Sequence, residues 1–316
     1  MLPSTYTAGT VSALIADINA ANAAGGSNTV TLVAGTSFTL TAVNNTTNGP
    51  TALPVIAAND NLTIVGNGDV IQRSTARGTP NFRLLDVAPG ASLTLQGLTL
   101  QGGVDVEGPF GVGLGGGAIY NYGGTLSLSG VTIQNNLVTG AGAEGGGIYS
   151  NDGSLTMQNC IVRNNQAIGS NGPNGSSGYA GRGGGIYIQG GTASLNNVTL
   201  DSNIAQGGKG GKGGKTANTV GKGSNHFGPG DGGDGLGGGV YVASGSVTLL
   251  NTSVSNNSAT GGIAGGRTAS DGLGEGGGLY IAALASVSLD VFTAAHIINN
   301  TASTAYPNIY GSYSTL

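Results

Sequence analysis

Apolar and polar residues alternate in short runs along most of the chain. In one run, a serine separates Leu126 from Leu128 and a threonine separates Val131 from Ile133. A period of two indicates β-strands with one buried face, because successive side chains point to opposite sides of a strand. The same inward positions recur at Leu93, Leu95, Leu98 and Leu100; at Leu155, Met157, Cys160 and Val162; at Ala193, Leu195, Val198 and Leu200; and at Val247, Leu249, Thr252 and Val254.

Each alternating run follows a glycine-rich strand and ends at an asparagine. The strand reads Gly-Gly-[Gly/Ala], then Ile, Val or Leu, then Tyr, and its tyrosines are Tyr120, Tyr149, Tyr187, Tyr241 and Tyr280. The closing asparagines are Asn136, Asn165, Asn203, Asn257 and Asn300. Tyrosine and asparagine are 16 residues apart in four repeats and 20 in the fifth, whereas the next tyrosine follows after 10 to 38 residues. A segment of nearly constant length that alternates with one of variable length is typical of a solenoid with solvent-facing loops.

These repeats predict an all-β fold, a single-stranded right-handed parallel β-helix with three strands per coil and about eight coils spaced by ~4.8 Å. We expect one domain over residues 1–316, with irregular first coils at 29–90 and regular coils at 91–316. The variable segments 104–114, 137–144, 166–182, 204–236 and 258–275 should all leave from one side, because each lies between the asparagine and the glycine-rich strand.

The two ends of the solenoid have different patterns. Val11, Leu14, Ile15 and Ile18 fall on one helical face, with Thr10 as an N-cap, which predicts a helix at residues 11–23 that covers the first coil. At the other end, residues 306–316 show no capping helix and no charged terminal strand. An open parallel edge tends to pair with another strand, so this end is expected to continue into a further domain or stack on a second molecule.

The strand Gly-Gly-Gly-Ile-Tyr, followed by Val-Thr-Ile-x-Asn-Asn, resembles the repeats of polymorphic outer-membrane proteins and related bacterial adhesins. The resemblance covers residues 91–316 and implies a β-helix of the pectin-lyase-like superfamily. That superfamily holds both enzymes and adhesins, so the resemblance implies the fold more than the function. The phenylalanine of the family's asparagine motif is replaced here by Val, Thr or Ile, and autotransport by this chain itself is not expected.

Composition narrows the functional classes. The 64 glycines are about three times the usual share, but they lack the strict every-third spacing of collagen, so a collagen-like fold is not expected. Only 8% of residues are charged and the net charge is −4, which argues against a nucleic-acid partner. No stretch approaches the ~20 apolar residues of a membrane-spanning helix. The scarcity of Lys, Glu and Cys favours an extracellular or cell-surface protein, although no signal peptide is visible at Met1.

The asparagine and tyrosine columns are the most regular candidates for a site. Because buried amides need partners, we expect the asparagines to form a ladder between coils. The tyrosines alternate with inward apolar residues, so they should point outward as an aromatic column. That column either stacks on itself and covers its own strand, or presents a platform for sugar rings or a partner.

The longest variable segment carries the second set of candidates. It contains Lys209, Lys212, Lys215 and Lys222, separated by glycines, and it would be either a mobile soluble loop or a surface for an anion or a partner. Asp231 and Asp234 lie in a Gly-Pro-Gly-Asp-Gly-Gly-Asp-Gly stretch and are weak candidates for Ca²⁺. No other metal or cofactor is expected.

Hydroxyl groups form a third regular column, at Thr94, Ser127, Thr156, Ser194, Thr248 and Ser288. A flat hydroxyl face of this kind could bind ice or a small ligand. Its presumed neighbour, the column of Thr99, Thr132, Thr199 and Ser253, is interrupted by Ile161. The sequence therefore favours an ordinary solvated strand face.

Acid–base chemistry has few candidates. Arg163 and Asp201 should face each other from adjacent coils, where the simplest interpretation is a surface ion pair. We therefore expect no catalytic residues, and a non-catalytic extracellular adhesive or structural module that binds a surface, a glycan, a protein or copies of itself. The alternatives are a polysaccharide lyase or glycoside hydrolase, and an ice- or small-ligand-binding face.

Overall fold

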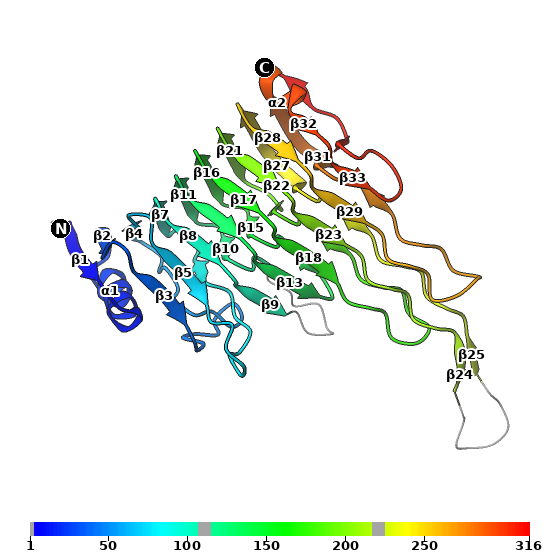
Figure 1. Ribbon diagram of the computed structural model, residues 1–316, viewed down its shortest axis with the longest axis horizontal. Coiled ribbons are helices and arrows are strands. Elements are labelled where there is room, and N and C mark those ends of the chain that lie inside the picture. Colours follow the sequence, from blue (N-terminus) through cyan, green and yellow to red (C-terminus); the bar gives the residue numbers. More distant parts are fainter. Residues whose placement is uncertain (1–2, 107–114, 217–224) are drawn as a thin grey trace.

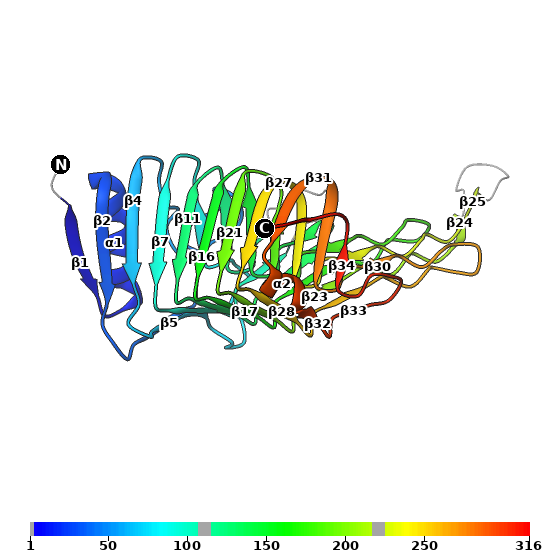
Figure 2. The same cartoon turned by 90° about the horizontal axis from the view of Figure 1, so that it is seen from above.

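The computed structural model describes residues 3–106, 115–216 and 225–316. In these ranges the chain forms parallel sheets whose strands stack along one long axis, with few helices (Figure 1). Seen from above, the coils form an elongated body, and a flatter extension of loops projects beyond it (Figure 2). The fold is an all-β parallel solenoid, as the repeats predict.

Three walls of parallel strands enclose the main core. The first wall is formed by β1 (Ser4–Ala8), β2 (Gly26–Leu32), β4 (Asp60–Val65), β7 (Ser92–Gln96), β11 (Thr125–Ser129), β16 (Ser154–Gln158), β21 (Thr192–Asn196) and β35 (Ser314–Thr315). The second is formed by β3 (Ser37–Leu40), β5 (Val70–Arg73), β8 (Thr99–Gln101), β12 (Thr132–Gln134), β17 (Ile161–Arg163), β22 (Thr199–Asp201), β28 (Ser253–Ser255) and β32 (Ile297–Ile298).

The third wall contains the glycine-rich strands and joins the first wall. It is formed by β6 (Leu85–Val87), β10 (Ile119–Tyr122), β15 (Ile148–Asn151), β20 (Ile186–Ile188) and β34 (Ile309–Tyr310). The long strands β27 (Val240–Leu250) and β31 (Leu279–Leu289) pair with both walls, so the two walls form one continuous sheet at this end of the solenoid.

The inward residues of successive coils stand in register. On the first wall Leu62, Leu93, Leu126, Leu155 and Ala193 are consecutive partners, and all five are buried. Full burial of one such leucine contributes roughly 1.5–3 kcal/mol. Cys160 is buried at the corner between β16 and β17, as expected for a small apolar residue.

Residues with positive φ turn the chain at the corners. Asn135, Asn164, Asn256 and Asn299 have φ between 54° and 58°, and each precedes the asparagine that closes a repeat. Asparagine adopts this left-handed conformation more readily than other side-chain-bearing residues. The first asparagine of each pair therefore makes the turn, and the second one enters the core.

Additional strands lie outside the three walls, on the loop side. After the asparagine turn come β9 (Val104–Val106), β13 (Leu137–Gly140), β18 (Gln166–Gly169), β23 (Ile204–Gln206), β29 (Ser258–Thr260) and β33 (Thr301–Ala302). Before the glycine-rich strands come β14 (Ala143–Glu144), β19 (Gly181–Arg182), β26 (Gly235–Leu236) and β30 (Gly274–Glu275). The prediction of three strands per coil is therefore wrong for these coils, because the bases of the loops also pair between coils.

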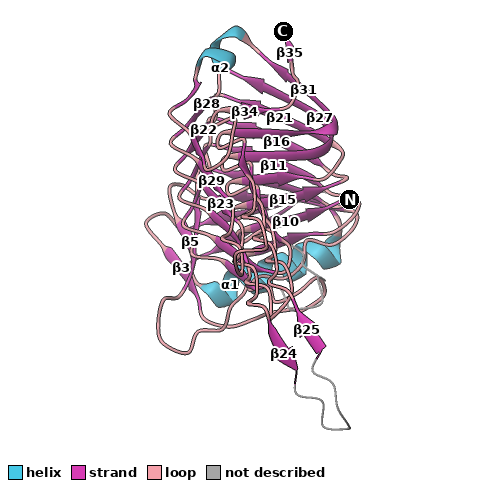
Figure 3. Ribbon diagram, turned by 90° about the vertical axis from the view of Figure 1, so that its right-hand side faces the viewer, coloured by secondary structure: helices cyan, strands magenta, loops and turns pink. Residues whose placement is uncertain are grey.

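The loops project together from one side of the body (Figure 1). Figure 3 looks at the molecule from this side and shows β24 (Gly214–Thr216) and β25 (Asn225–Phe227) at the tip. These two form the one antiparallel strand pair among the named strands of the described chain. The common side agrees with the expectation for the variable segments, within the residues that the structure describes.

Helices lie at both ends of the solenoid. The helix expected at residues 11–23 is α1 (Val11–Ala24), in which the Thr10 side chain accepts a hydrogen bond from the Ala13 N–H and Leu14 and Ile18 are buried. Residues 306–316 contain no helix, as expected, but a short helix that the repeats did not predict, α2 (Val291–Ala295), follows β31, with Asp290 as its N-cap. Within the described residues no helix is long and apolar enough to span a membrane.

Candidate functional site in the loop bundle

An asparagine ladder supports the bases of the loops. The side-chain oxygen of Asn165 accepts from the backbone N–H (3.1 Å) and side-chain amide (2.9 Å) of Asn136, and Asn203 does the same for Asn165. The pattern continues through Asn257 and Asn300. These buried amides bond to one another and to backbone carbonyls, so they are not available to a sugar ligand.

The three glycines before each tyrosine turn the loop back onto the third wall. The first has positive φ in successive coils, with 64° at Gly145, 62° at Gly183 and 65° at Gly237. A Cβ on the second, Gly146, would lie 2.3 Å from the Gly184 carbonyl oxygen of the next coil. The motif therefore combines a left-handed turn with close backbone packing, both of which favour glycine.

The tyrosines form a continuous stack, but they are not an exposed platform. Ring centroids from Tyr120 through Tyr149, Tyr187, Tyr241 and Tyr280 to Tyr310 are separated by 5.3, 5.2, 5.1, 4.8 and 4.4 Å. Tyr120, Tyr149 and Tyr187 are only 3–6% exposed, and Tyr241 and Tyr280 are half-buried.

The bases of the loops cover the first part of this stack. Glu144 of β14 interacts with Tyr187, and Arg182 of β19 forms an ion pair with Glu144 at 3.0 Å. Burial raises the pKa of Glu144, and Arg182 opposes that shift. The rings therefore stack on one another, as in the first interpretation of the column, whereas the interpretation of an exposed platform does not fit Tyr120, Tyr149 and Tyr187, which the returning strands cover.

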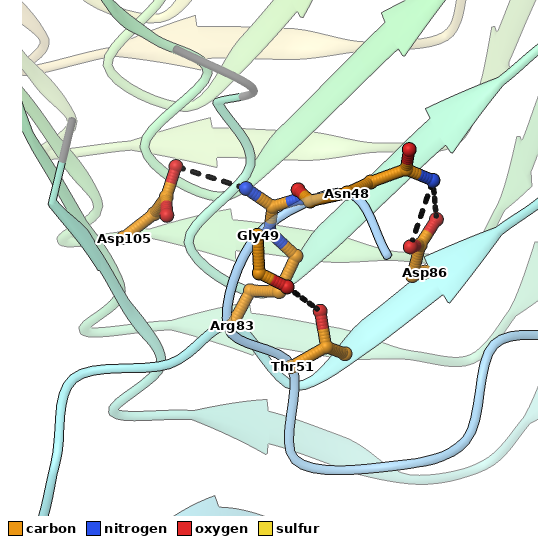
Figure 4. A network of polar contacts seen from close by, with 6 residues as sticks. All are labelled: Asn48, Gly49, Thr51, Arg83, Asp86 and Asp105. Carbon is orange, nitrogen blue, oxygen red and sulfur yellow. Dashed lines mark hydrogen bonds and ion pairs between the residues drawn. The ribbon is translucent and has the colours of Figure 1, made fainter. Parts of the chain in front are cut away.

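A buried ionic cluster at the start of the stack was missed by the sequence analysis (Figure 4). Arg83 donates to the Asn48 carbonyl at 2.7 Å and pairs with Asp105 at 3.0 Å, and its guanidinium lies 4.9 Å from the centre of the Tyr120 ring. Asp86 accepts from the Asn48 amide at 3.0 and 3.3 Å.

Asp86 of β6 is the register partner of Tyr120 of β10 on the third wall. Burial raises the pKa of both Asp86 and Asp105. Two acids, an arginine and a tyrosine are thus brought together, but their side chains are enclosed by protein. The cluster therefore acts first as a structural connection between the irregular first coils and the regular repeats.

The glycine-rich loops pack into a bundle of extended arms, which we call the loop bundle. Its arms are residues 170–175 and 176–181 from one loop, 206–214 and 228–235 from the next, and 260–266 and 270–275 from the third. Arms 170–175, 206–214 and 260–266 form one layer, and the other three arms form a second layer, as the hydrogen bonds show.

Hydrogen bonds between the arms recur every third residue. The N–H groups of Gly172 and Gly175 donate to the carbonyls of Lys209 and Lys212, and those of Gly230 and Gly233 donate to Gly211 and Gly208. A repeat of three residues per turn without internal hydrogen bonds is the property of the polyproline II conformation. Glycines therefore recur at every third residue within these arms, although the chain as a whole does not keep that spacing.

Glycine is required in the bundle by space. A Cβ would lie 1.8 Å from the Pro173 carbonyl oxygen at Gly211 and 1.9 Å from the Ser176 carbonyl oxygen at Gly230. No real Cβ fits at such distances, so only glycine lets the arms approach closely enough to hydrogen-bond. The alternative of a mobile soluble loop therefore does not fit the arms at 206–214 and 228–235, which are hydrogen-bonded to their neighbours along their length.

The remaining residue of each turn points away from the bundle. Lys209 and Lys212 are exposed on one layer, and Asp231 and Asp234 lie on the other. Asp231 and Asp234 line a groove of about 630 Å³ together with Asp271, Arg182 and Tyr179. The bundle therefore has a basic face and an acidic face on opposite layers.

The other predicted residues of this loop contribute less. Lys215 belongs to β24, and Lys222 lies outside the described residues. The aspartate Oδ1 atoms accept backbone hydrogen bonds, from Ser270 to Asp231 and from Leu273 to Asp234, both at 2.8 Å. Across the described ranges no group of three or more His, Cys, Asp or Glu residues is arranged to hold a metal ion.

Arg163 and Asp201 are register partners on the second wall, as expected, but each forms its side-chain hydrogen bonds with other residues. Arg163 donates to Gln134 at 2.8 Å, whereas Asp201 accepts from Asn256, Ser202 and Ser255. Burial opposes ionisation of Asp201, but these hydrogen bonds hold its pKa below the ordinary value. An acid with a lowered pKa and without a facing base is poorly suited to proton transfer.

The hydroxyl face is more regular than the sequence analysis expected. The column of Thr94 and Ser127 extends back to Thr5, Thr29 and Thr63. A second column runs beside it on the same wall, through Ser92, Thr125, Ser154, Thr192, Ser246 and Ser286. The column of Thr99, Thr132, Thr199 and Ser253 that is interrupted by Ile161 lies on the second wall, so it is not the neighbour of the first column.

The chain was compared with family models, with curated proteins and with solved structures, and none of them matches it.

Proposed function

We propose that this protein is a non-catalytic, extracellular or cell-surface module that uses the loop bundle to bind a surface, a glycan, a protein or copies of itself. The observation that carries the proposal is the bundle itself. Its backbone is held by hydrogen bonds at every third residue, so the backbone positions that carry its outward side chains are set before a partner arrives. Preorganisation of this kind reduces the entropy lost on binding.

The finer features of the fold belong to the same proposal. We infer a right-handed solenoid of the pectin-lyase-like type, because crossovers between parallel strands are right-handed in about 98% of cases. The low content of charged residues and the single cysteine support a secreted adhesin-like protein. A crystal structure with left-handed coils would contradict this part of the proposal.

The test compares binding with turnover. The full chain is screened on a glycan array and on mineral and cell-wall surfaces, and the same polysaccharides are assayed for reducing or unsaturated ends. Gly211→Ala should weaken binding, because it forces the arms apart, whereas Gly228→Ala should retain it, because a Cβ there meets nothing within 4 Å. Release of new chain ends would instead favour the alternative of a lyase or hydrolase.

A second candidate function rests on the hydroxyl face. Two adjacent columns of Ser and Thr repeat at ~4.8 Å between strands and at about 6.6 Å along them. Such a grid could bind an ordered array of water or sugar. Thr156→Lys, at the middle of the first column, should abolish inhibition of ice recrystallisation or binding to a crystalline glycan, and wild-type protein without either activity would refute this candidate.

A further inference from the structure

The basic and acidic faces of the loop bundle have matched geometry. Lys209 and Lys212 lie three residues apart on one arm of a loop, and Asp231 and Asp234 lie three residues apart on the returning arm. At about 3.1 Å per residue, both rows have a spacing of about 9 Å. Both rows also belong to the middle pair of arms, between the loops on either side.

We propose that two copies of this chain associate by packing the Lys209–Lys212 face of one loop bundle against the Asp231–Asp234 face of another. The inference rests on the proposed function, in which the bundle is the binding surface, and it identifies the partner as a second copy. Because the rows are central in the bundle, they meet whether the two bundles run in the same or in opposite directions.

Both rows are prepared for an ionic contact. Backbone N–H groups of Ser270 and Leu273 hold one oxygen of each aspartate, which leaves the second oxygen for a cation. Across the described residues, the ion pairs are Arg83–Asp105 and Arg182–Glu144, and neither involves Lys209 or Lys212. Within the described residues, Lys209 and Lys212 therefore form no ion pair with a carboxylate of their own chain.

An exposed apolar side chain also lies beside each row, and both of these side chains belong to the third loop of the bundle, which contains arms 260–266 and 270–275. The Gly210 N–H donates to the Ile263 carbonyl, which places Ile263 beside the lysine row, and Leu273 donates to the side chain of Asp234. Ile263 is 60% exposed and Leu273 is 46% exposed. Contact between the two faces would remove apolar surface from water in addition to pairing charges.

The contact joins different faces of the two copies, so it leaves one face unused on each. Such heterologous contacts generate open assemblies or rings rather than closed dimers. Exposed charge pairs are screened over about 10 Å at 0.1 M salt. The association should therefore be strongest at low ionic strength and should extend beyond dimers as concentration rises.

The experiment is sedimentation velocity of the full chain across protein concentration at low and high NaCl. Wild-type protein should form larger species at low salt and dissociate at high salt. Lys209→Gln/Lys212→Gln and Asp231→Asn/Asp234→Asn should each weaken association about tenfold, as expected for two exposed ion pairs. Asparagine keeps the side-chain oxygen that the Ser270 and Leu273 amides need, so the second variant preserves the bundle.

Charge reversal supplies the decisive comparison. Lys209→Glu/Lys212→Glu and Asp231→Lys/Asp234→Lys should each fail to self-associate, and their equimolar mixture should form a mixed complex. Arg77→Glu/Arg163→Glu changes the same number of exposed charges elsewhere and should behave as wild type. Circular dichroism verifies that each variant is folded.

Wild-type protein that stays monomeric at low salt, or association unaffected by both neutral variants, would overturn the inference. The proposed function survives that result if the monomer still binds a glycan or surface through the bundle. If the monomer binds no glycan, protein or surface, the proposed function fails as well.

Discussion

Arg83 and Asp105 form an ion pair of 3.0 Å in which the side chains are only 1% and 7% exposed. The pair links the segment before β6 to β9, and it lies where the tyrosine stack begins. Neither charge is stabilised by bulk water, so each depends on the other and on nearby polar groups.

Replacing Arg83 alone should therefore be strongly destabilising. Arg83→Met leaves Asp105 buried without its partner, and we expect a loss of about 3–5 kcal/mol in the free energy of unfolding. The double variant Arg83→Met/Asp105→Leu should be clearly more stable than the single one, because it removes both charges. Urea denaturation measures the free energy of unfolding of the single and the double variant, with exposed Arg77→Met as a control. Equal losses in the single and double variants would contradict this account.

The asparagine ladder predicts a second stability effect. Asn203→Ala removes the acceptor for two donors of Asn165 and the donor to the Val162 carbonyl and Asn257. Leaving buried polar groups without partners should cost at least about 2 kcal/mol. Asn61→Ala, on an exposed strand position, should change thermal stability little. A result in which both variants unfold at the same temperature would show that the ladder is not needed.

Glycine substitutions should separate the loop bundle from the solenoid. Gly211→Ala places a Cβ 1.8 Å from a backbone oxygen, so the arms must move apart and lose hydrogen bonds worth about 1 kcal/mol each. Hydrogen exchange should rise in residues 170–181, 206–214 and 260–275, while the core strands stay protected. Gly228→Ala should leave exchange unchanged. Unaltered exchange in Gly211→Ala would mean that the arms are not packed as described.

The tyrosine stack predicts alkaline behaviour. Burial raises the pKa of Tyr120 from 10.0 to about 12, and it also raises the pKa of Tyr187 and Tyr280. Because the folded-state pKa lies above the unfolded value, the stability contributed by these neutral phenols is fully present below pH 10. It is lost as pH rises through about 12.

Ultraviolet titration of tyrosinate, followed beside circular dichroism, measures this loss. Tyr120, Tyr187 and Tyr280 should ionise only together with unfolding, because burial raises the pKa of each phenol. Ionisation of Tyr120, Tyr187 and Tyr280 with the strand signal intact would contradict the burial of the stack.

Several elements could be predicted from local pattern. Alternation of Leu126 and Leu128 with polar residues is enough to identify a strand and its inward face, because the period of a strand is two. Thr10 and the spacing of Leu14 and Ile18 likewise indicate α1. The asparagine pairs mark corners because asparagine tolerates positive φ.

Other features depended on segments that are distant in sequence. Arg83 meets Asp105 and Tyr120 only after the irregular first coils have closed. The second hydroxyl column could be recognised once the strand register had placed Ser92 beside Thr125. Both features come from the alignment of neighbouring coils, which periodicity within one coil does not specify.

The sequence by itself determined the solenoid, because short-range alternation, turn residues and repeat length act within each coil. Only the tertiary structure decided that the tyrosines are covered and that the loops pack into a bundle. A loop glycine has no local preference that predicts its partner, since its role is to let a backbone from another loop approach. The two charged faces exist because that packing leaves one residue in three pointing outward.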